Sequence, residues 1–139
     1  MILSIIVPVY NEEKTIIEIL KKIKKNSPNN IKYEVIVIDD GSFDSTKKLL
    51  EDNKDLYDKL LINENNKGKG YSVKKGITNS SGTHIIFQDA DLEYDPSDFV
   101  RFEEIFSEFD ADGIIGSRFI YSKYTRSHNI LNKIGNKIL

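Results

Sequence analysis

The stretch HIIFQDADLE at residues 84–93 joins a short apolar run directly to two carboxylates, Asp89 and Asp91. The run is too short for a typical helix and predicts a buried strand. Because alternate residues of a strand point to the same side, the two carboxylates can face one point in space. Held about 5 Å apart, they would repel by roughly 3 kcal/mol at an effective dielectric of about 20. Bound Mg²⁺ or Mn²⁺ would offset that repulsion; the alternative is that both acids only cap the following loop or helix.

Four other short apolar runs predict strands at residues 2–7, 33–38, 59–62 and 112–117. Helical segments alternate with them. This alternation predicts an α/β fold, a mostly parallel Rossmann-like sheet with helices on both faces. In such sheets ligands bind beyond the carboxyl ends of the strands, where the strand order reverses. If the order is 3-2-1-4, that point lies between the strand ending at Pro8 and the strand ending at Asp89.

Capping residues and apolar spacing predict the helices. Asn11 is the expected N-cap of the first helix, with Glu12 and Glu13 in its first turn. Its expected apolar face is Ile16, Ile19, Leu20 and Ile23, opposite a lysine-rich face that we expect to be solvated. The second helix opens at Asp44 and Ser45.

The remaining helices are expected to bury apolar side chains in the same way. In the second helix these are Leu49, Leu50 and Leu56. The glycine-containing loop 65–70 is expected to lead into a third helix through Val73 and Ile77. The fourth helix begins at Asp95-Pro96, a cap followed by a proline at the first helical position. Its expected core residues are Phe99, Phe102, Phe106 and Phe109, and a last amphipathic helix is expected at residues 130–138.

Length and composition place the chain among ordinary globular proteins. Its 139 residues predict one domain, with 39% hydrophobic and 30% charged residues. The net charge of −2 argues against non-specific nucleic-acid binding. The chain has no cysteine, which excludes disulfides and thiolate chemistry and fits a reducing compartment. The first apolar run ends at Pro8, too soon for a signal peptide or a spanning helix.

Two further polar motifs follow predicted strands or precede a helix. Asp39 and Asp40 form a second acidic pair, and carboxylates can accept hydrogen bonds from a nucleobase or a ribose. The alternative is that one of them caps the following turn. The loop NKGKG at residues 66–70 brings two lysines and flexible backbone toward the expected cleft, which suits phosphate. It matches neither the dinucleotide fingerprint nor the Walker pattern.

Together, five segments resemble the family-two glycosyltransferases of GT-A fold. They are IIVPVYNEEKTI (5–16), VIVIDDGSFDST (35–46), NKGKGYSVKKG (66–76), FQDADLEYDP (87–96) and GSRF (116–119). The order and spacing fit over essentially the whole chain. Within the family, the chain looks most similar to the branch that includes dolichyl- and polyprenyl-phosphate sugar synthases.

The resemblance implies specific roles for the site residues. The implied nucleotide-sugar contacts are Pro8, Tyr10, Glu12, Val37 (or its neighbour Ile38), Asp39, Asp40, Lys69, Asp89 and Ala90, with Asp39 reading the base. Asp89 and Asp91 match the family's D-x-D motif. The implied ligands of Mg²⁺ or Mn²⁺ are Asp89, Asp91 and Glu93, although relatives can carry a glutamine at the position of Glu93. The implied catalytic residues are Asp91 and Arg118, and Arg126 is a further implied phosphate partner.

The resemblance also implies an inverting hexosyl transfer from a UDP- or GDP-sugar to a polyprenyl phosphate, a dolichyl phosphate or a cell-surface glycan. Residues 1–139 would then be the nucleotide-binding part of a longer catalytic domain, cytoplasmic or peripheral at the cytoplasmic face of the membrane. We expect this part to bind nucleotide sugar and metal but to turn over poorly alone. No general base can be assigned, and an anionic phosphate acceptor needs none.

Three other functions remain open from the sequence. A haloacid-dehalogenase-type phosphatase would use Asp89 as nucleophile and Asp91 as acid/base, but that motif usually lies near the N-terminus. A receiver-type signalling domain uses an acidic pair after its first strand, where this chain has PVYNE. A transferase-like binding module without activity is the third. Covalent trapping of Asp89 would favour the phosphatase, and metal-dependent hydrolysis of a nucleotide sugar would argue against the inactive module.

Overall fold

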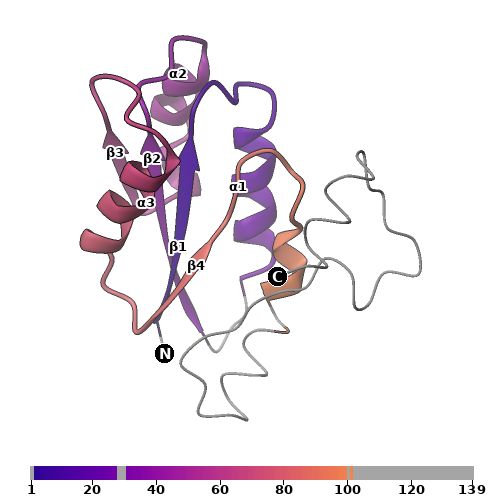
Figure 1. Cartoon of the computed structure of the whole chain (residues 1–139). Helices are drawn as coiled ribbons and strands as arrows, with labels where there is room; N and C mark the ends of the chain where they lie inside the picture. Colours follow the sequence, from indigo (N-terminus) through magenta and orange to yellow (C-terminus); the bar gives the residue numbers. More distant parts are fainter. Residues whose placement is uncertain (1, 28–30, 100, 102–139) are drawn as a thin grey trace, which may run out of the picture. The chain divides into compact units, whose positions relative to one another are not determined.

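The computed structural model describes residues 2–27, 31–99 and 101, which lie within one compact unit, Met1–Glu104. Strands and helices alternate along it (Figure 1). The elements in chain order are β1 (Ile2–Val9), α1 (Ile16–Lys25), β2 (Lys32–Asp39), α2 (Thr46–Asp52), the 3₁₀ helix η1 (Lys54–Leu56), β3 (Lys59–Ile62), α3 (Lys69–Thr78), β4 (His84–Phe87) and the 3₁₀ helix η2 (Pro96–Asp98).

The four described strands form one parallel sheet in the order β3-β2-β1-β4 (Figure 1). β1 pairs with β2 along its whole length, from Ile2 opposite Lys32 to Val9 opposite Asp39. On its other side β1 pairs with the shorter β4. The predicted fold class is therefore confirmed, and the strand order is the one that the sequence analysis took as its condition for placing the site. The strand predicted at residues 112–117 and the helix predicted at 130–138 lie outside the described residues.

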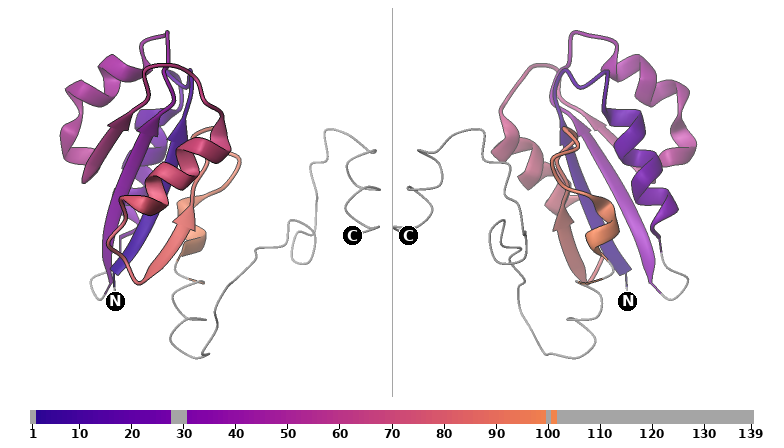
Figure 2. Two further views of the ribbon diagram at one scale, coloured as in Figure 1. Left: turned by 60° about the vertical axis from the view of Figure 1, so that its left-hand side comes forward. Right: turned by 90° about the vertical axis from the view of Figure 1, so that its right-hand side faces the viewer.

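Helices cover both faces of the sheet, as predicted, because the central strands are apolar on both sides. Figure 2 shows α3 against one face and α1 and α2 against the other. On the α1 face, one core cluster joins β1 to the helix through Leu3, Ile5, Val7, Val9, Ile16, Ile19, Leu20 and Ile23. On the α3 face, a smaller cluster contains Ile6, Ile36 and Ile38. The predicted buried stripe of α1 is thus confirmed.

Helix α3 lies unusually close to the sheet. Its buried residues are the small Ser72 and Gly76, whereas Val73 is half-buried and Ile77 is exposed. A β-carbon added at Gly76 would lie 2.6 Å from Cγ2 of Ile6. The helix predicted through Val73 and Ile77 is therefore confirmed, and it contacts β1 and β2 through its small residues.

Three local predictions are corrected. Helix α1 begins at Ile16 with Thr15 as its N-cap, and Asn11 instead has a left-handed φ of 55° within the preceding loop. In α2, Leu50 is buried but Leu49 is only half-buried. Strand β4 was predicted to be buried, yet it lies at the edge of the described sheet and Phe87 is 55% exposed. A short apolar run alone does not distinguish an edge strand from a central one.

The predicted cap at Asp95 is confirmed. Its side chain accepts a hydrogen bond of 3.0 Å from the Ser97 amide, and Pro96 follows as the first helical residue. Phe99 is buried and meets the ring of Tyr33 edge-on, 6.2 Å between centroids. Phe102, Phe106 and Phe109 lie outside the described residues. Within the described part of the chain, no helix has the length and apolar character needed to cross a membrane.

Candidate functional site

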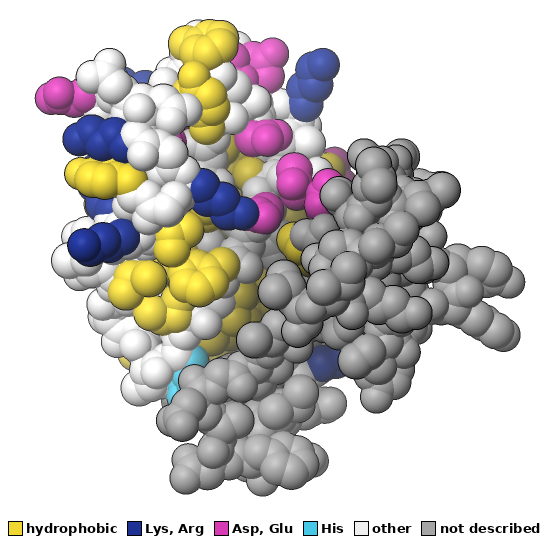
Figure 3. All heavy atoms as spheres, viewed as in Figure 1, with side chains coloured by type: hydrophobic (Ala, Val, Ile, Leu, Met, Phe, Trp, Pro, Cys, Tyr) yellow, Lys and Arg dark blue, Asp and Glu magenta, His cyan; other side chains and the backbone are white. Residues whose placement is uncertain are grey.

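A cavity of about 320 Å³ opens at the carboxyl ends of β1, β2 and β4. The strand order reverses at this position: the connection after β1 leads to β2 on one side of β1, whereas the connection after β3 returns to β4 on its other side. The cavity is lined by Pro8, Val9, Tyr10, Glu12, Asp40, Asn66, Gly68, Lys69, Ser72, Asp89, Ala90 and Asp91. Figure 3 shows acidic side chains gathered on the upper part of one face and lysines along its left side.

Most of the predicted contact residues therefore meet at one place. Those that line the cavity are Pro8, Tyr10, Glu12, Asp40, Lys69, Asp89, Ala90 and Asp91. Val37 is fully buried in the core beside α1 and is not part of the lining. Asp39 and Glu93 are also absent from the lining. Arg118 and Arg126 lie outside the described residues.

Hydrogen bonds hold the loop after β1 against the loop after β2. The Asn11 amide donates to Oγ of Ser42 (2.9 Å), and Oδ1 of Asn11 accepts from the Phe43 amide (3.0 Å). The Glu12 amide donates to Oγ1 of Thr46 (2.9 Å). The left-handed φ of Asn11 lets its backbone and side chain bond the same neighbouring loop. Tyr10 and Glu12 are thus presented to the cavity on a braced segment.

The ring of Tyr10 meets the ring of Phe43 edge-on, with 6.0 Å between centroids. Tyr10 lines the cavity, and Phe43 is 82% exposed beside it. Tyr10 thus brings an aromatic ring to the cavity, and Phe43 packs edge-on against it outside the lining. Sequence reasoning did not single out Phe43; its place between Ser42 and Asp44 in an otherwise polar loop was the available signal.

Asp39 is only 1% exposed, at the end of β2. Its Oδ1 accepts a hydrogen bond of 3.0 Å from the Ser42 amide. Its Oδ2 is buried and has no hydrogen-bond partner among the described residues. Leaving a buried acceptor unsatisfied costs about 1–3 kcal/mol, and more for a charged group. The Oδ2 atom of Asp39 can therefore accept a hydrogen bond from a ligand N–H or O–H.

Both carboxylate oxygens of Asp40, by contrast, already accept hydrogen bonds within the protein. Its Oδ1 accepts from Nδ2 of Asn63 (2.7 Å) and from the Lys67 amide (3.0 Å), and its Oδ2 accepts from the Gly68 amide (2.8 Å). Burial raises the pKa of Asp40, but these hydrogen bonds outweigh it, so that the pKa lies below its ordinary value. Asp40 thus holds the loop between β3 and α3, and Gly68 supplies the φ of 87° that the loop requires.

Lys69 is the first residue of α3 and forms an ion pair with Asp89. Its Nζ lies 2.6 Å from Oδ1 and 2.8 Å from Oδ2 of Asp89. Asp91 is exposed, and its Oδ1 accepts a hydrogen bond of 3.0 Å from the Glu93 amide. The two acids lie in the turn after β4, so strand alternation is not what brings them together. The turn includes Leu92, which has a left-handed φ of 64°.

Gln88 stabilises this turn and was missed by sequence reasoning. It is almost fully buried, and its Nε2 donates to the backbone oxygens of Asp89 (2.9 Å) and Tyr94 (3.1 Å). The signal was a polar residue placed between the apolar run and the two acids.

The donor set suits a hard divalent cation only in part. Among the described residues, no group of three or more carboxylate or imidazole side chains is arranged to hold a metal ion. The predicted set of Asp89, Asp91 and Glu93 is therefore not assembled, and Glu93 is exposed outside the cavity lining. Asp89 and Asp91 do line the cavity, and Asp89 already binds a cation, the Lys69 ammonium. Two carboxylates of this kind fit Mg²⁺ or Mn²⁺ when phosphate oxygens complete the coordination.

Comparisons with known proteins agree with this geometry. The model of the family "Glycosyl transferase family 2" matches residues 4–135. The chain is 39% identical over 129 residues to the dolichyl-phosphate β-glucosyltransferase of Dictyostelium discoideum, covering 84% of this chain and 39% of that protein. It superimposes on S. aureus TarS 1–349 in complex with UDP with a TM-score of 0.68 and 26% identity, covering 86% of this chain and 39% of that one.

A third similar protein is the mannosyltransferase PcManGT of Pyrobaculum calidifontis, solved in complex with GDP-Man and Mn²⁺. The TM-score is 0.59 at 29% identity, covering 70% of this chain and 30% of that one. The fold is that of the GT-A glycosyltransferases on which the chain superimposes. The chain belongs to glycosyl transferase family 2, which confirms the resemblance found in the sequence and decides against the phosphatase and receiver alternatives.

Proposed function

We propose that this chain contributes the donor site of a glycosyltransferase that moves a hexose from a nucleoside diphosphate sugar to a lipid-phosphate acceptor. The observation that carries the proposal is the meeting of Tyr10, Lys69, Asp89 and Asp91 on one cavity at the point where the strand order reverses. The relatives support the donor class, because TarS was solved with UDP and PcManGT with GDP-Man. The name of the Dictyostelium relative supports a dolichyl phosphate acceptor.

In this proposal the nucleoside lies against the loops after β1 and β2. Tyr10 provides an aromatic surface for the base, and the unpartnered Oδ2 of Asp39 accepts a hydrogen bond from a base N–H that reaches it. The donor set fits a divalent ion that Asp89 and Asp91 would hold together with the diphosphate. Such an ion, when bound, stabilises the negative charge that develops on the departing nucleoside diphosphate.

The residues of this chain have separable tasks in the transfer. Lys69 neutralises part of the diphosphate charge as the bond to the sugar anomeric carbon breaks, and Asp91 would hold, with Asp89, the divalent ion that offsets the rest of that charge. The transition state has oxocarbenium character, as in other glycosyl transfers. We infer a single displacement with inversion, in which an anionic phosphate oxygen of the acceptor bonds to the anomeric carbon as the nucleoside diphosphate leaves; that oxygen needs no general base. Arg118 remains the proposed partner for a phosphate group.

Residues 1–139 are proposed to form the nucleotide-binding part of the catalytic domain, working on the cytoplasmic side at the membrane surface. The chain spans 39% of the Dictyostelium glucosyltransferase, 39% of TarS 1–349 and 30% of PcManGT. We therefore propose that this chain alone binds the donor and turns it over slowly or not at all. Full turnover by the purified chain would contradict that last statement.

The test is isothermal titration of the chain with UDP-, GDP- and dTDP-sugars, with and without Mn²⁺. We expect one nucleotide class to bind, more tightly with Mn²⁺, and Asp91→Asn to remove the effect of Mn²⁺. Glu51→Gln is the control, because Glu51 is an exposed carboxylate on α2 outside the cavity lining. Failure of every nucleotide sugar to bind would contradict the proposal.

A further inference from the structure

The ion pair between Lys69 and Asp89 occupies a carboxylate that the proposed function assigns to a divalent ion. The ammonium touches both oxygens of that carboxylate, at 2.6 and 2.8 Å. Both residues line the cavity, and the Lys69 side chain is 63% exposed while that of Asp89 is 27% exposed. The pair therefore lies in the open cavity, where an incoming anion can reach the ammonium.

The backbone below Lys69 is fixed, whereas its side chain can move. Asp40 accepts hydrogen bonds from the amides of Lys67 and Gly68, immediately before Lys69. Lysine is a compact charge on a flexible four-carbon stem, so Nζ can move by several ångströms without a backbone change. A diphosphate in the same cavity would offer that ammonium more negative charge than one carboxylate does. It can therefore draw the ammonium away from Asp89.

We propose that Lys69 couples the two ligands of the donor site. With no nucleotide bound, its ammonium neutralises Asp89 and competes with a divalent cation for that carboxylate. When a nucleoside diphosphate binds, Lys69 turns to the diphosphate and leaves both oxygens of Asp89 free for the cation. The cation and the nucleotide then favour each other's binding, and because binding linkage is reciprocal, each raises the affinity of the other by the same amount.

This role predicts opposite signs for the two ligands when the ammonium is removed. In Lys69→Met, Asp89 loses its internal counter-charge, so Mn²⁺ alone should bind more tightly. The nucleoside diphosphate alone should bind more weakly, since it loses a cationic partner. A lysine that only contacts phosphate, or only supports the fold, would not raise the affinity for Mn²⁺.

Because the pair is partly exposed, the expected changes are moderate. Partly exposed ion pairs are worth up to about 1 kcal/mol, which corresponds to about a fivefold change in a dissociation constant. We expect Mn²⁺ alone to bind about three- to fivefold more tightly to Lys69→Met than to the unmodified chain at low salt. The gain should shrink at 0.5 M NaCl, where exposed charges are screened.

The experiment is a set of three titrations on the full 139-residue chain: Mn²⁺ alone, UDP or GDP alone, and Mn²⁺ with the nucleotide saturating. Lys74→Met is the matched control, because it removes an exposed lysine of the same helix that does not line the cavity. Thermal unfolding of both variants by circular dichroism shows that they are folded.

The results separate this inference from the proposed function on which it rests. Tighter Mn²⁺ binding with weaker nucleotide binding in Lys69→Met, and neither change in Lys74→Met, supports the coupling role. Unchanged or weaker Mn²⁺ binding in Lys69→Met overturns it, while nucleotide binding by the unmodified chain leaves the proposed function standing. If the unmodified chain binds no nucleotide under any condition, both proposals fail together.

Discussion

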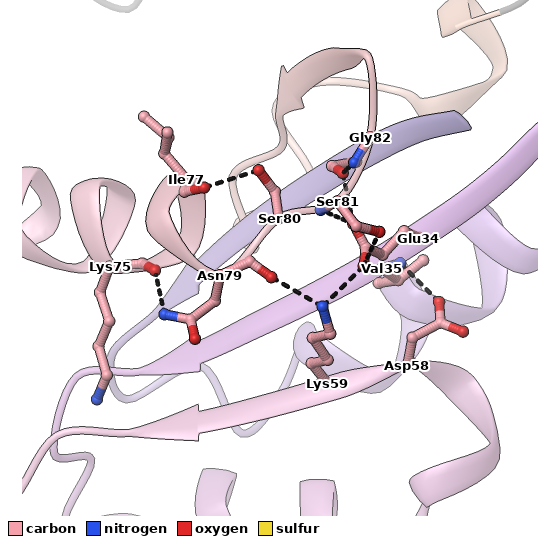
Figure 4. A network of polar contacts seen from close by, with 11 residues as sticks. Glu34, Val35, Asp58, Lys59, Lys75, Ile77, Asn79, Ser80, Ser81 and Gly82 are labelled. Atoms are coloured by element: carbon pink, nitrogen blue, oxygen red, sulfur yellow. Dashed lines mark hydrogen bonds and ion pairs between the residues drawn. The ribbon is translucent and has the colours of Figure 1, made fainter. Parts of the chain in front are cut away.

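Carboxylates at the two ends of the parallel sheet differ in how fully the protein hydrogen-bonds them. At the amino end, Glu34 of β2 is saturated: Oε2 accepts from Oγ of Ser4 (2.6 Å) and the Ser81 amide (2.8 Å), and Oε1 accepts from Nζ of Lys59 and Oγ of Ser81, both at 2.8 Å. Figure 4 shows Lys59 and Ser81 converging on Glu34. At the carboxyl end, Asp39 has one oxygen without a partner among the described residues, and Asp91 is exposed.

The difference separates a carboxylate that stabilises the fold from carboxylates that are available to ligands. Glu34 ties β1, β3 and the turn before β4 to β2, and the Gly82 amide extends the network by donating to Oγ of Ser4 (2.9 Å). Burial raises the pKa of Glu34, but the hydrogen bonds from Lys59, Ser4 and Ser81 outweigh it and lower the pKa to about 2. No ligand is needed to stabilise this charge.

The largest expected effect is on stability at the amino end. Glu34→Ala should lower the free energy of unfolding by about 3 kcal/mol, because it leaves the buried hydroxyl of Ser4 without an acceptor and removes the bonds from Lys59 and Ser81. Urea unfolding followed by circular dichroism measures the change. Glu18→Ala removes an exposed helix ion pair with Lys22 and should cost less than about 0.5 kcal/mol. If Glu34→Ala costs no more than this control, the amino end does not have the stabilising role we assign to it.

The free energy of unfolding should depend on pH through the ionisation of Glu34. The pKa of Glu34 is lower in the folded chain than its ordinary value of 4.5, so its contribution is present above about pH 4.5 and is lost as the pH falls toward 2. We expect this to remove about 2 kcal/mol over that interval, after allowing for the partial exposure of Lys59. Urea unfolding at several pH values, compared with Glu34→Gln, isolates the effect from other acids. Parallel pH curves for the two proteins would refute the assignment.

Asp40 lies at the carboxyl end but resembles Glu34 in being saturated. Asp40→Asn should lower the free energy of unfolding by about 1.5 kcal/mol, because an amide cannot accept from all three donors and loses the charge-assisted bonds. The loop that carries Lys69 should loosen, and nucleotide affinity should fall. Unfolding and nucleotide titration measured on the same variant test both parts. A loss of nucleotide affinity with unchanged stability would mean that Asp40 binds the ligand directly.

Asp39, unlike Asp40, has an oxygen without a partner among the described residues, and its substitution should have the smallest effect on stability. Asp39→Asn replaces a buried carboxylate with an unpartnered oxygen by a neutral side chain, so stability should change by less than about 1 kcal/mol. Nucleotide binding should weaken strongly, because the free acceptor is replaced in part by donors. Thermal unfolding and UDP or GDP titration give the two readings. A large loss of stability would show that Asp39 is structural, like Glu34.

Several features of the site were predictable from the order of apolar runs and polar motifs. Pro8, Asp40 and Asp89 each follow an apolar run, and parallel strands bring such ends to one edge, so their meeting could be expected. The hydrogen-bond partners of these carboxylates could not be predicted in this way. Asp39 and Asp40 are adjacent in sequence, yet one is left with an unpartnered oxygen and the other bonds residues 63–68, because neighbouring side chains of an extended segment point to opposite sides.

The sequence by itself determined the elements, the parallel sheet and the family, because apolar periodicity and motif spacing are local properties of the chain. The strand order joins segments far apart in the sequence and was decided by the tertiary structure. The tertiary structure decided that α3 packs through Ser72 and Gly76, that Gln88 holds the turn after β4, and that Lys69 pairs with Asp89. These contacts join residues on different elements or depend on how closely two backbones approach. Such distances are set by packing of the whole fold, and no local pattern encodes them.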